Sequence, residues 1–156
     1  MVEQFDEIDR AILRALQQDG RMSITDLAQR VELTPPSVQR RIKLLEEAGV
    51  IRGYVALVDP LKLDLTVTAF ILVETVAGCQ LEEVAAWLSA FPEVQEVHNL
   101  LGEWCFLIKV RTRSPQTLED LLYRQIRHYP AVRRTHTTMA TSSPYEITQL
   151  PLPERD

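Results

Sequence analysis

Apolar residues in the first fifty positions recur with the three- and four-residue spacing of amphipathic helices. The pattern predicts helices over about residues 7–19, 24–31 and 35–48. Pro35 and Pro36 fit the start of the third helix, because a first-turn proline lacks only an N–H group that has no partner inside the helix. Two short helices joined by a three-residue turn, inside a three-helix unit, indicate a helix-turn-helix. Residues that favour the N-cap position precede all three helices: Asp6, Ser23 and Thr34.

After residue 65 the pattern changes to runs of β-branched and other apolar residues separated by turn residues. Amphipathic helical stretches interrupt these runs twice. The resulting order, β-α-β-β-α-β, is the ferredoxin-like arrangement, and the fold class of the whole chain is therefore α+β. The expected strands are residues 66–75, 94–101, 104–110 and 132–141, and the expected helices begin at Leu81 and Pro115.

These elements predict a chain of two modules. We expect an N-terminal winged helix-turn-helix domain at 1–53, a linker strand within 54–65, a ferredoxin-like ligand-binding and dimerisation domain at 66–143, and a C-terminal tail at 144–156. The tail contains one further strand-like stretch, residues 145–150.

The expected sheet has one face covered by its two helices. Phe70, Leu72, Phe106 and Ile108 alternate along their strands with other apolar residues, which predicts that both faces of the sheet are apolar. A large uncovered apolar face indicates an interface, and we expect two copies of the chain to dimerise sheet to sheet.

The third helix carries polar and basic residues opposite its buried stripe. Guanidinium groups suit guanine edges and phosphates, and short polar side chains near a helix start suit bases and backbone. A solvated face, with Lys43 and Glu47 paired four residues apart, also fits this pattern, but the preceding turn and helix favour DNA. Arg41 has a second interpretation, because its aliphatic stem can cover the edge of the core and brace the domain. The candidate DNA-binding residues are Ser23, Thr34, Pro36, Ser37, Gln39, Arg40, Arg41 and Lys43.

The charge distribution agrees with DNA contact through a single element. The 156 residues carry a net charge of −5, which argues against a general polyanion binder. Residues 35–53 nevertheless have a local excess of basic over acidic side chains. Residues 54–156, in contrast, hold 9 Lys and Arg against 13 Asp and Glu.

The sequence argues against several classes of protein. Two distant cysteines, Cys79 and Cys105, provide neither a disulfide framework nor a CxxC zinc clamp. The apolar runs, such as residues 69–73, are at most five residues long and so far shorter than a membrane span. No secretory signal is visible, and we expect a cytoplasmic protein with no membrane partner. We find no nucleophile with a base, no Gly-rich phosphate loop and no paired carboxylates, and therefore predict neither an enzyme nor a cofactor.

The two modules together resemble the Lrp/AsnC family of bacterial and archaeal transcription regulators. The resemblance covers nearly the whole chain, from about Phe5 to Thr141. It rests on Asp-Glu-Ile-Asp-Arg-Ala-Ile-Leu at 6–13, Gly-Arg-Met-Ser at 20–23, Asp-Leu-Ala at 26–28, Leu-Thr at 33–34, Arg-Ile-Lys-Leu-Leu-Glu at 41–46, Gly-Val-Ile at 49–51 and Gly-Glu-Trp at 102–104.

The resemblance implies a homodimer that often assembles into tetramers or octamers and binds promoter DNA. It also implies a small-molecule effector, usually an amino acid, bound between effector domains. Glu32 and Asp64 stand where the family usually has glycine, and Cys105 stands where an acidic residue commonly follows the hairpin glycine. A neutral thiol cannot hold an ammonium group as a carboxylate can. The candidate effector-binding residues are Leu101, Gly102, Glu103, Trp104, Cys105, Thr135 and Thr137.

Three alternatives remain at this point. His98, Cys105 and His136 would form a metal or redox site if they shared a sheet face, although no pair has the short spacing of a known site. Tetrapyrrole (sirohaem) decarboxylases resemble the same two-module architecture without acting on DNA, and an enzyme of that type would need His98, His128 or His136 beside an arginine. A purely structural oligomer would leave the basic helix unexplained.

Overall fold

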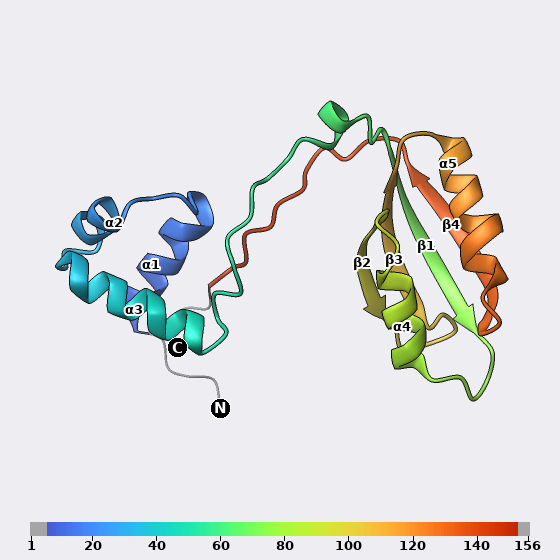
Figure 1. Ribbon diagram of the computed structural model, residues 1–156, viewed down its shortest axis with the longest axis horizontal. Coiled ribbons are helices and arrows are strands. Elements are labelled where there is room, and N and C mark those ends of the chain that lie inside the picture. The colour runs from blue at the N-terminus through green and yellow to red at the C-terminus, as the bar shows by residue number, and fades with distance from the viewer. Residues whose placement is uncertain (1–5, 153–156) are drawn as a thin grey trace. The chain divides into compact units, whose positions relative to one another are not determined.

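The computed structural model describes residues 6–152, and the chain forms two compact units (Figure 1). The helical unit contains the chain up to Leu57 together with the C-terminal segment from Glu146 onward. The sheet unit is Val58–Tyr145. The chain therefore passes from one unit to the other twice, as the green and red connections in Figure 1 show.

The helical unit consists of α1 (Glu7–Gln18), α2 (Ile24–Arg30) and α3 (Pro35–Glu47), which confirms the predicted helices. At the start of α1, Asp6 accepts a hydrogen bond from the Asp9 N–H group, and the Asp9 side chain accepts one from the Asp6 N–H group, which is a capping box. The helices pack through one buried cluster. Its members are Ile12, Leu13, Ala15, Leu27, Ala28, Val38, Ile42 and Leu45.

The turn between α2 and α3 places Glu32 in the left-handed region, at φ 55°. The Leu33 N–H group bonds the Ala28 carbonyl and the Glu32 N–H group bonds the Gln29 carbonyl, the pattern of a Schellman motif. This backbone conformation favours glycine, because any residue with a Cβ atom is strained there. The same holds at Asp64, at φ 58°, which follows a short 3₁₀ turn at Pro60–Leu63. Both departures from glycine noted in the sequence therefore fall where the backbone favours glycine.

Glu32→Gly is expected to raise the free energy of unfolding by about 1 kcal/mol, because it relieves the left-handed strain at this turn. Thermal unfolding of the intact chain measures the effect. Glu32→Ala is the matched control, since it removes the carboxylate but keeps the Cβ, and it should give no comparable gain. An unchanged or lower unfolding temperature for Glu32→Gly would contradict the argument.

The sheet unit confirms the ferredoxin-like order. Its strands are β1 (Val67–Thr75), β2 (Val94–Asn99), β3 (Phe106–Thr112) and β4 (Val132–Ala140). They are antiparallel and lie in the order β2-β3-β1-β4. The helices are α4 (Leu81–Ser89) and α5 (Pro115–Asp120), and α5 continues as a π turn (Leu121–Gln125) and a 3₁₀ turn (Ile126–His128).

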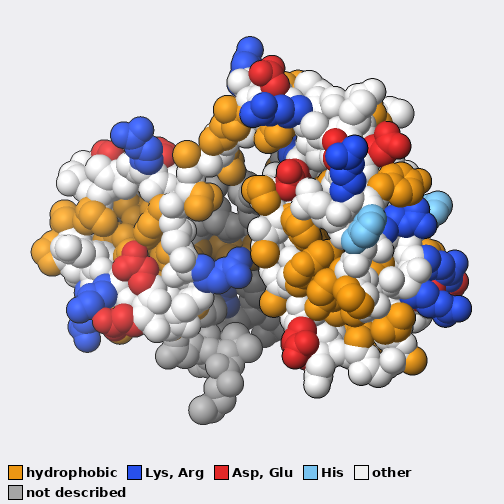
Figure 2. Space-filling view, turned by 45° about the vertical axis from the view of Figure 1, so that its right-hand side comes forward, with side chains coloured by type: hydrophobic (Ala, Val, Ile, Leu, Met, Phe, Trp, Pro, Cys, Tyr) orange, Lys and Arg blue, Asp and Glu red, His pale blue; other side chains and the backbone are white. Residues whose placement is uncertain are grey.

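The apolar residues singled out in the sequence divide between the two faces of the sheet. Phe106 and Ile108 are fully buried with Ile71 in the core beneath the helices. Phe70 and Leu72 lie on the other face, and in the register of β1 and β3 they are opposite Lys109 and Leu107. Phe106 and Ile108 therefore belong to the covered face of the sheet, and Phe70 and Leu72 belong to the open face. Figure 2 shows that hydrophobic side chains, in orange, still reach the surface of both units.

Neither of the two connecting stretches forms a strand. Residues 54–58, within the expected linker strand at 54–65, and residues 145–150, expected to be strand-like, are irregular or extended and lack ladder partners among the described residues. Strand-like residues make a strand only where a neighbouring backbone supplies the hydrogen bonds. In the part of the chain that the structure covers, no helix is long and apolar enough to cross a membrane.

Candidate nucleic-acid interface

The exposed side of α3 presents polar and basic side chains. Ser37, Gln39, Arg40 and Lys43 are exposed, while Val38, Ile42 and Leu45 on the same helix are buried in the core. This separation follows from helical periodicity, which directs the apolar stripe inward and leaves the remaining side chains in solvent.

Arg40 and Lys43 differ in their ion pairs with neighbouring residues. Lys43 lies 3.5 Å from Glu47, and both side chains are well exposed. Arg40 makes no ion pair with any of the residues 6–152. An exposed pair of this kind is worth little, and Lys43 can leave Glu47 for a phosphate at small cost. Arg40 is already available to donate two parallel hydrogen bonds to a guanine edge.

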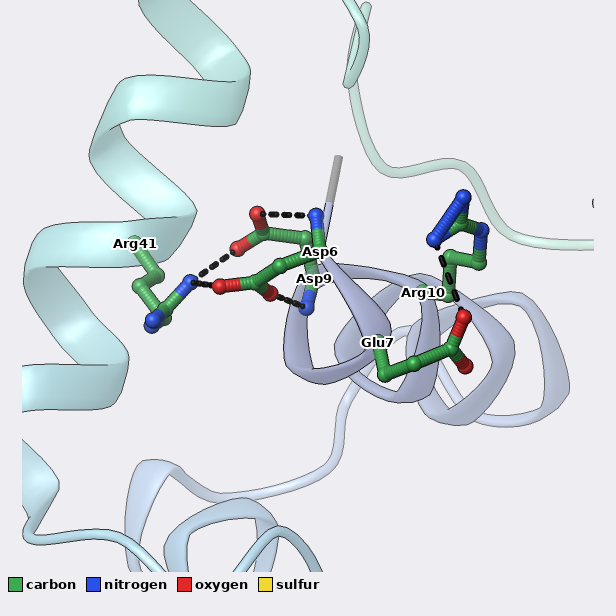
Figure 3. Close-up of polar contacts among 5 residues, drawn as sticks. All are labelled: Asp6, Glu7, Asp9, Arg10 and Arg41. Atoms are coloured by element: carbon green, nitrogen blue, oxygen red, sulfur yellow. Dashed lines mark hydrogen bonds and ion pairs between the residues drawn. The ribbon is translucent and has the colours of Figure 1, made fainter. Parts of the chain in front are cut away.

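Arg41 joins α3 to the start of α1 (Figure 3). Its Nη1 atom donates to Asp6 and to Asp9, each at 2.8 Å. The hydrogen bond to Asp9, and after it the bond to Asp6, raise the pKa of Arg41. Desolvation of the guanidinium acts in the opposite direction but does not cancel these bonds. Desolvation alone would raise the pKa of Asp6, but the Asp9 N–H group and the Arg41 guanidinium together lower it. The structure thus shows an ionic brace between α3 and α1, and a contact of Arg41 with DNA stays a prediction.

Three other predicted residues, Ser23, Thr34 and Pro36, lie at the starts of α2 and α3. The Ser23 hydroxyl caps α2, accepting from the Asp26 N–H group, and donates to the Asp26 carboxylate at 2.6 Å. Thr34 makes no side-chain cap for α3, and its hydroxyl lies 2.9 Å from that of Ser37. Pro36 occupies the first turn of α3, as expected. A hydroxyl pair is therefore exposed at the start of α3, where backbone N–H groups lack intrahelical partners.

A second group of polar side chains surrounds the hairpin between β2 and β3. The Leu100 N–H group donates to the Cys105 carbonyl at 2.9 Å, and Leu101, within the turn, is fully exposed. The Arg134 guanidinium lies 4.5 Å from the centre of the Trp104 ring and also donates to Glu103. His136 is 6.3 Å from the same ring, measured between centroids.

Glu74 connects this hairpin group to β1. It accepts hydrogen bonds from Arg134 and from Arg133, the latter at 2.6 Å, and its side chain is 12% exposed. The hydrogen bond from Arg134 is the main cause that lowers the pKa of Glu74. Desolvation of the carboxylate alone would raise that pKa. Bonds to Glu74 and then to Glu103 raise the pKa of Arg134. Glu103 is thus occupied by an arginine in this structure.

The remaining effector candidates lie at different positions around the hairpin. Cys105 is half-buried, with its Sγ atom 3.2 Å from the Thr75 hydroxyl, and its N–H group donates to the Val73 carbonyl. Thr135 pairs with Val73, and Thr137 with Ile71. Successive side chains on a strand alternate between faces, so these threonines lie on the opposite face of β4 from Arg134 and His136.

Sequence reasoning did not place Glu74 in this group, and the histidine–cysteine alternative does not assemble. The contact between Glu74 and Arg134 depends on the register of β1 and β4, which no local pattern reveals. His98 lies 3.1 Å from Glu96, and His136 lies beside Trp104. Within residues 6–152 no cluster of three His, Cys, Asp or Glu side chains could hold a metal ion.

Two family models match the chain, one for each unit. A model described as winged helix-turn-helix DNA-binding matches residues 5–52, and one described as Lrp/AsnC ligand binding domain matches residues 68–150.

Individual proteins are similar over nearly the full length. The HTH-type transcriptional regulator FL11 of Pyrococcus horikoshii is 35% identical over 147 residues, which cover 94% of this chain and 96% of that protein. The HTH-type transcriptional regulator LrpA of Mycobacterium tuberculosis is 35% identical over 149 residues, which cover 96% of this chain and 98% of that protein. A solved transcriptional regulator of Neisseria meningitidis in complex with L-Met superimposes with a TM-score of 0.90 at 30% identity, covering 95% of this chain and 97% of that one.

Proposed function

The chain belongs to the Lrp/AsnC family of transcription regulators, and from this premise we propose that it reads operator DNA with the exposed side of α3. It is a DNA-binding regulator and not an enzyme, so the tetrapyrrole decarboxylase alternative is set aside. We place it in the cytoplasm, with residues 1–53 as the DNA-binding module and 66–143 as the effector and assembly module.

The assignment of α3 rests on Arg40, which is exposed and makes no ion pair within residues 6–152, on a helix that is otherwise well anchored. Ser37, Gln39 and Lys43 share its exposed side, and the Arg41 brace fixes α3 against α1. Arg40 reads a guanine, Gln39 reads a neighbouring base, and Ser37, Thr34 and Lys43 contact phosphates. Arg41, Ser23 and Pro36 support this surface from within the helical unit.

We test this proposal by selecting binding sites from fragmented genomic DNA with purified protein. A homodimer places two recognition helices about 34–36 Å apart, so the selected sites should be imperfect palindromes with half-sites one DNA turn apart. Arg40→Ala, carried through the same selection, should lose the motif. Enriched sites without two-fold character, or the same motif from the Arg40→Ala protein, would count against it.

We also propose that the sheet unit assembles the dimer, and higher oligomers such as tetramers or octamers, and takes a small effector at the hairpin. The open sheet face with Phe70 and Leu72 supports the assembly. The proposed effector site comprises Leu101, Gly102, Glu103, Trp104 and Cys105, whereas the other two candidates, Thr135 and Thr137, lie on the face of β4 away from Arg134 and His136. An L-Met complex of a structurally similar regulator supports an amino-acid-like effector.

Cys105→Asp is expected to create or strengthen a response to free amino acids, because a carboxylate at the hairpin can hold an ammonium group and a thiol cannot. Isothermal titration with a panel of amino acids measures the change. Cys105→Asn is the control, since it has the size of Asp but no charge. If no amino acid gives heat with Cys105→Asp, position 105 does not decide the effector.

A further inference from the structure

The C-terminal segment 146–152 is held on α1 by a group of hydrogen bonds with a specific geometry. The Gln17 side-chain amide donates to the Leu150 carbonyl at 3.1 Å, and its oxygen accepts from the Leu150 N–H group at 2.6 Å. One side chain therefore satisfies both backbone groups of one residue, as a neighbouring strand would. Leu150 is thereby held at a fixed place along α1.

A third bond and an apolar contact complete the attachment. The Gln149 side-chain amide donates to the Gln17 carbonyl at 3.1 Å. That carbonyl is in the last turn of α1, where carbonyl groups lack intrahelical partners. Leu152, which is half-buried, packs against the core of the helical unit. The segment thus caps the C-terminal end of α1 and adds one side chain to the core of the helical unit.

This attachment has the character of a reversible contact. Ile147 and Leu150 remain 57% and 71% exposed, so most of the apolar surface of the segment is not buried against the helical unit. Segments with few buried apolar contacts open at low free-energy cost. The same segment begins where the chain leaves the sheet unit at Tyr145. Its docking adds a second chain connection to the one that leaves Leu57.

We propose that residues 146–152 are a strap, and that its docking on α1 sets how tightly the DNA-binding unit is tethered to the assembly domain. With the strap docked, the helical unit is held by two connections; with it released, by one. Two half-sites must be engaged together by the two helical units of a dimer, and a looser tether lowers the effective concentration of the second unit at its half-site. This inference rests on the proposed dimeric operator binding. Strap docking thereby controls cooperative operator binding without touching DNA.

The experiment compares the wild-type protein with Gln17→Ala and Leu152→Ala, which attack the two sides of the contact independently. Gln29→Ala is the matched control, a glutamine on α2 that is exposed in the structure. Hydrogen exchange of the intact protein without DNA reports strap docking through the Leu150 amide. Affinity for a duplex with both half-sites, and for one with a single half-site, reports the effect on DNA.

The strap predicts a protected Leu150 amide in the wild-type and control proteins and loss of that protection in both strap variants. Affinity for the two-half-site duplex should fall about tenfold in the strap variants, while affinity for the single half-site stays unchanged. An equal loss on both duplexes would show that the segment only supports folding of the helical unit and would overturn the proposal. So would a Leu150 amide that exchanges freely in the wild-type protein, or unchanged affinity for both duplexes in variants that have lost protection. Failure of the wild-type protein to bind either duplex would instead overturn the assignment of α3, and the exchange data would still decide whether the strap docks.

Discussion

Arg40→Ala is expected to weaken binding to the preferred operator by about 1–3 kcal/mol, about 5- to 150-fold, while leaving the fold intact. A bidentate contact between a guanidinium and a guanine discriminates against other bases by this amount, and alanine cannot replace it. Arg40 is exposed and makes no ion pair within residues 6–152, so its loss removes no intramolecular contact that the structure describes. Fluorescence anisotropy at one fixed salt concentration measures the change, and thermal unfolding checks stability.

Lys43→Ala is the matched control for Arg40. Both residues are basic and exposed on α3, but we assign Lys43 to phosphate. Its loss should weaken binding to all sequences about equally and reduce the dependence of log affinity on log salt by about one unit. If Arg40→Ala leaves affinity for the preferred sequence unchanged, or weakens random DNA equally, Arg40 does not read a base.

Local sequence patterns predicted the elements well because the signals are local. Prolines at the start of α3 and the caps Asp6 and Ser23 act within one helical turn, so their effects can be read from neighbouring positions. The alternation of β-branched residues likewise located the strands of the sheet. The left-handed backbone at Glu32 could also be predicted, because the family usually has glycine at this position and glycine is common where φ is positive.

The remaining features depend on contacts between distant parts of the chain. Phe106 and Leu107 differ by one position, and that single step decides which face of the sheet a side chain occupies. The Glu74 contact with Arg134 spans 60 residues, and that between Gln17 and Leu150 spans 133. No local periodicity encodes such pairs. The hairpin group and the strap could therefore be found only from the structure.

The sequence pattern placed Arg41 on α3, but its contacts with Asp6 and Asp9 at the start of α1 came only from the structure. Replacing Arg41 is expected to have a large effect on stability. Arg41→Ala should lower the free energy of unfolding of the helical unit by about 1–2 kcal/mol, because it removes two charged hydrogen bonds that are partly exposed to solvent. The Arg41 side chain is 30% exposed and that of Asp9 is 17% exposed. Chemical denaturation of the intact protein, followed by hydrogen exchange in α1 and α3, measures the loss.

The pH dependence of this loss separates a brace from a contact that exists only with DNA. The pKa of Asp6 is lowered in the folded protein, so its contribution to stability is present above the pKa of the unfolded chain, about 3.9, and is lost as pH falls through the lower folded value. The stability difference between the wild-type and Arg41→Ala proteins should therefore be full at pH 7 and shrink below about pH 4. Asp6→Asn is the control, because it keeps a capping side chain for α1 while removing the charge that Arg41 binds, and it should reproduce part of the loss. An Arg41→Ala protein as stable as the wild type at pH 7, but weaker on DNA, would mean that Arg41 acts on phosphate and not as a brace.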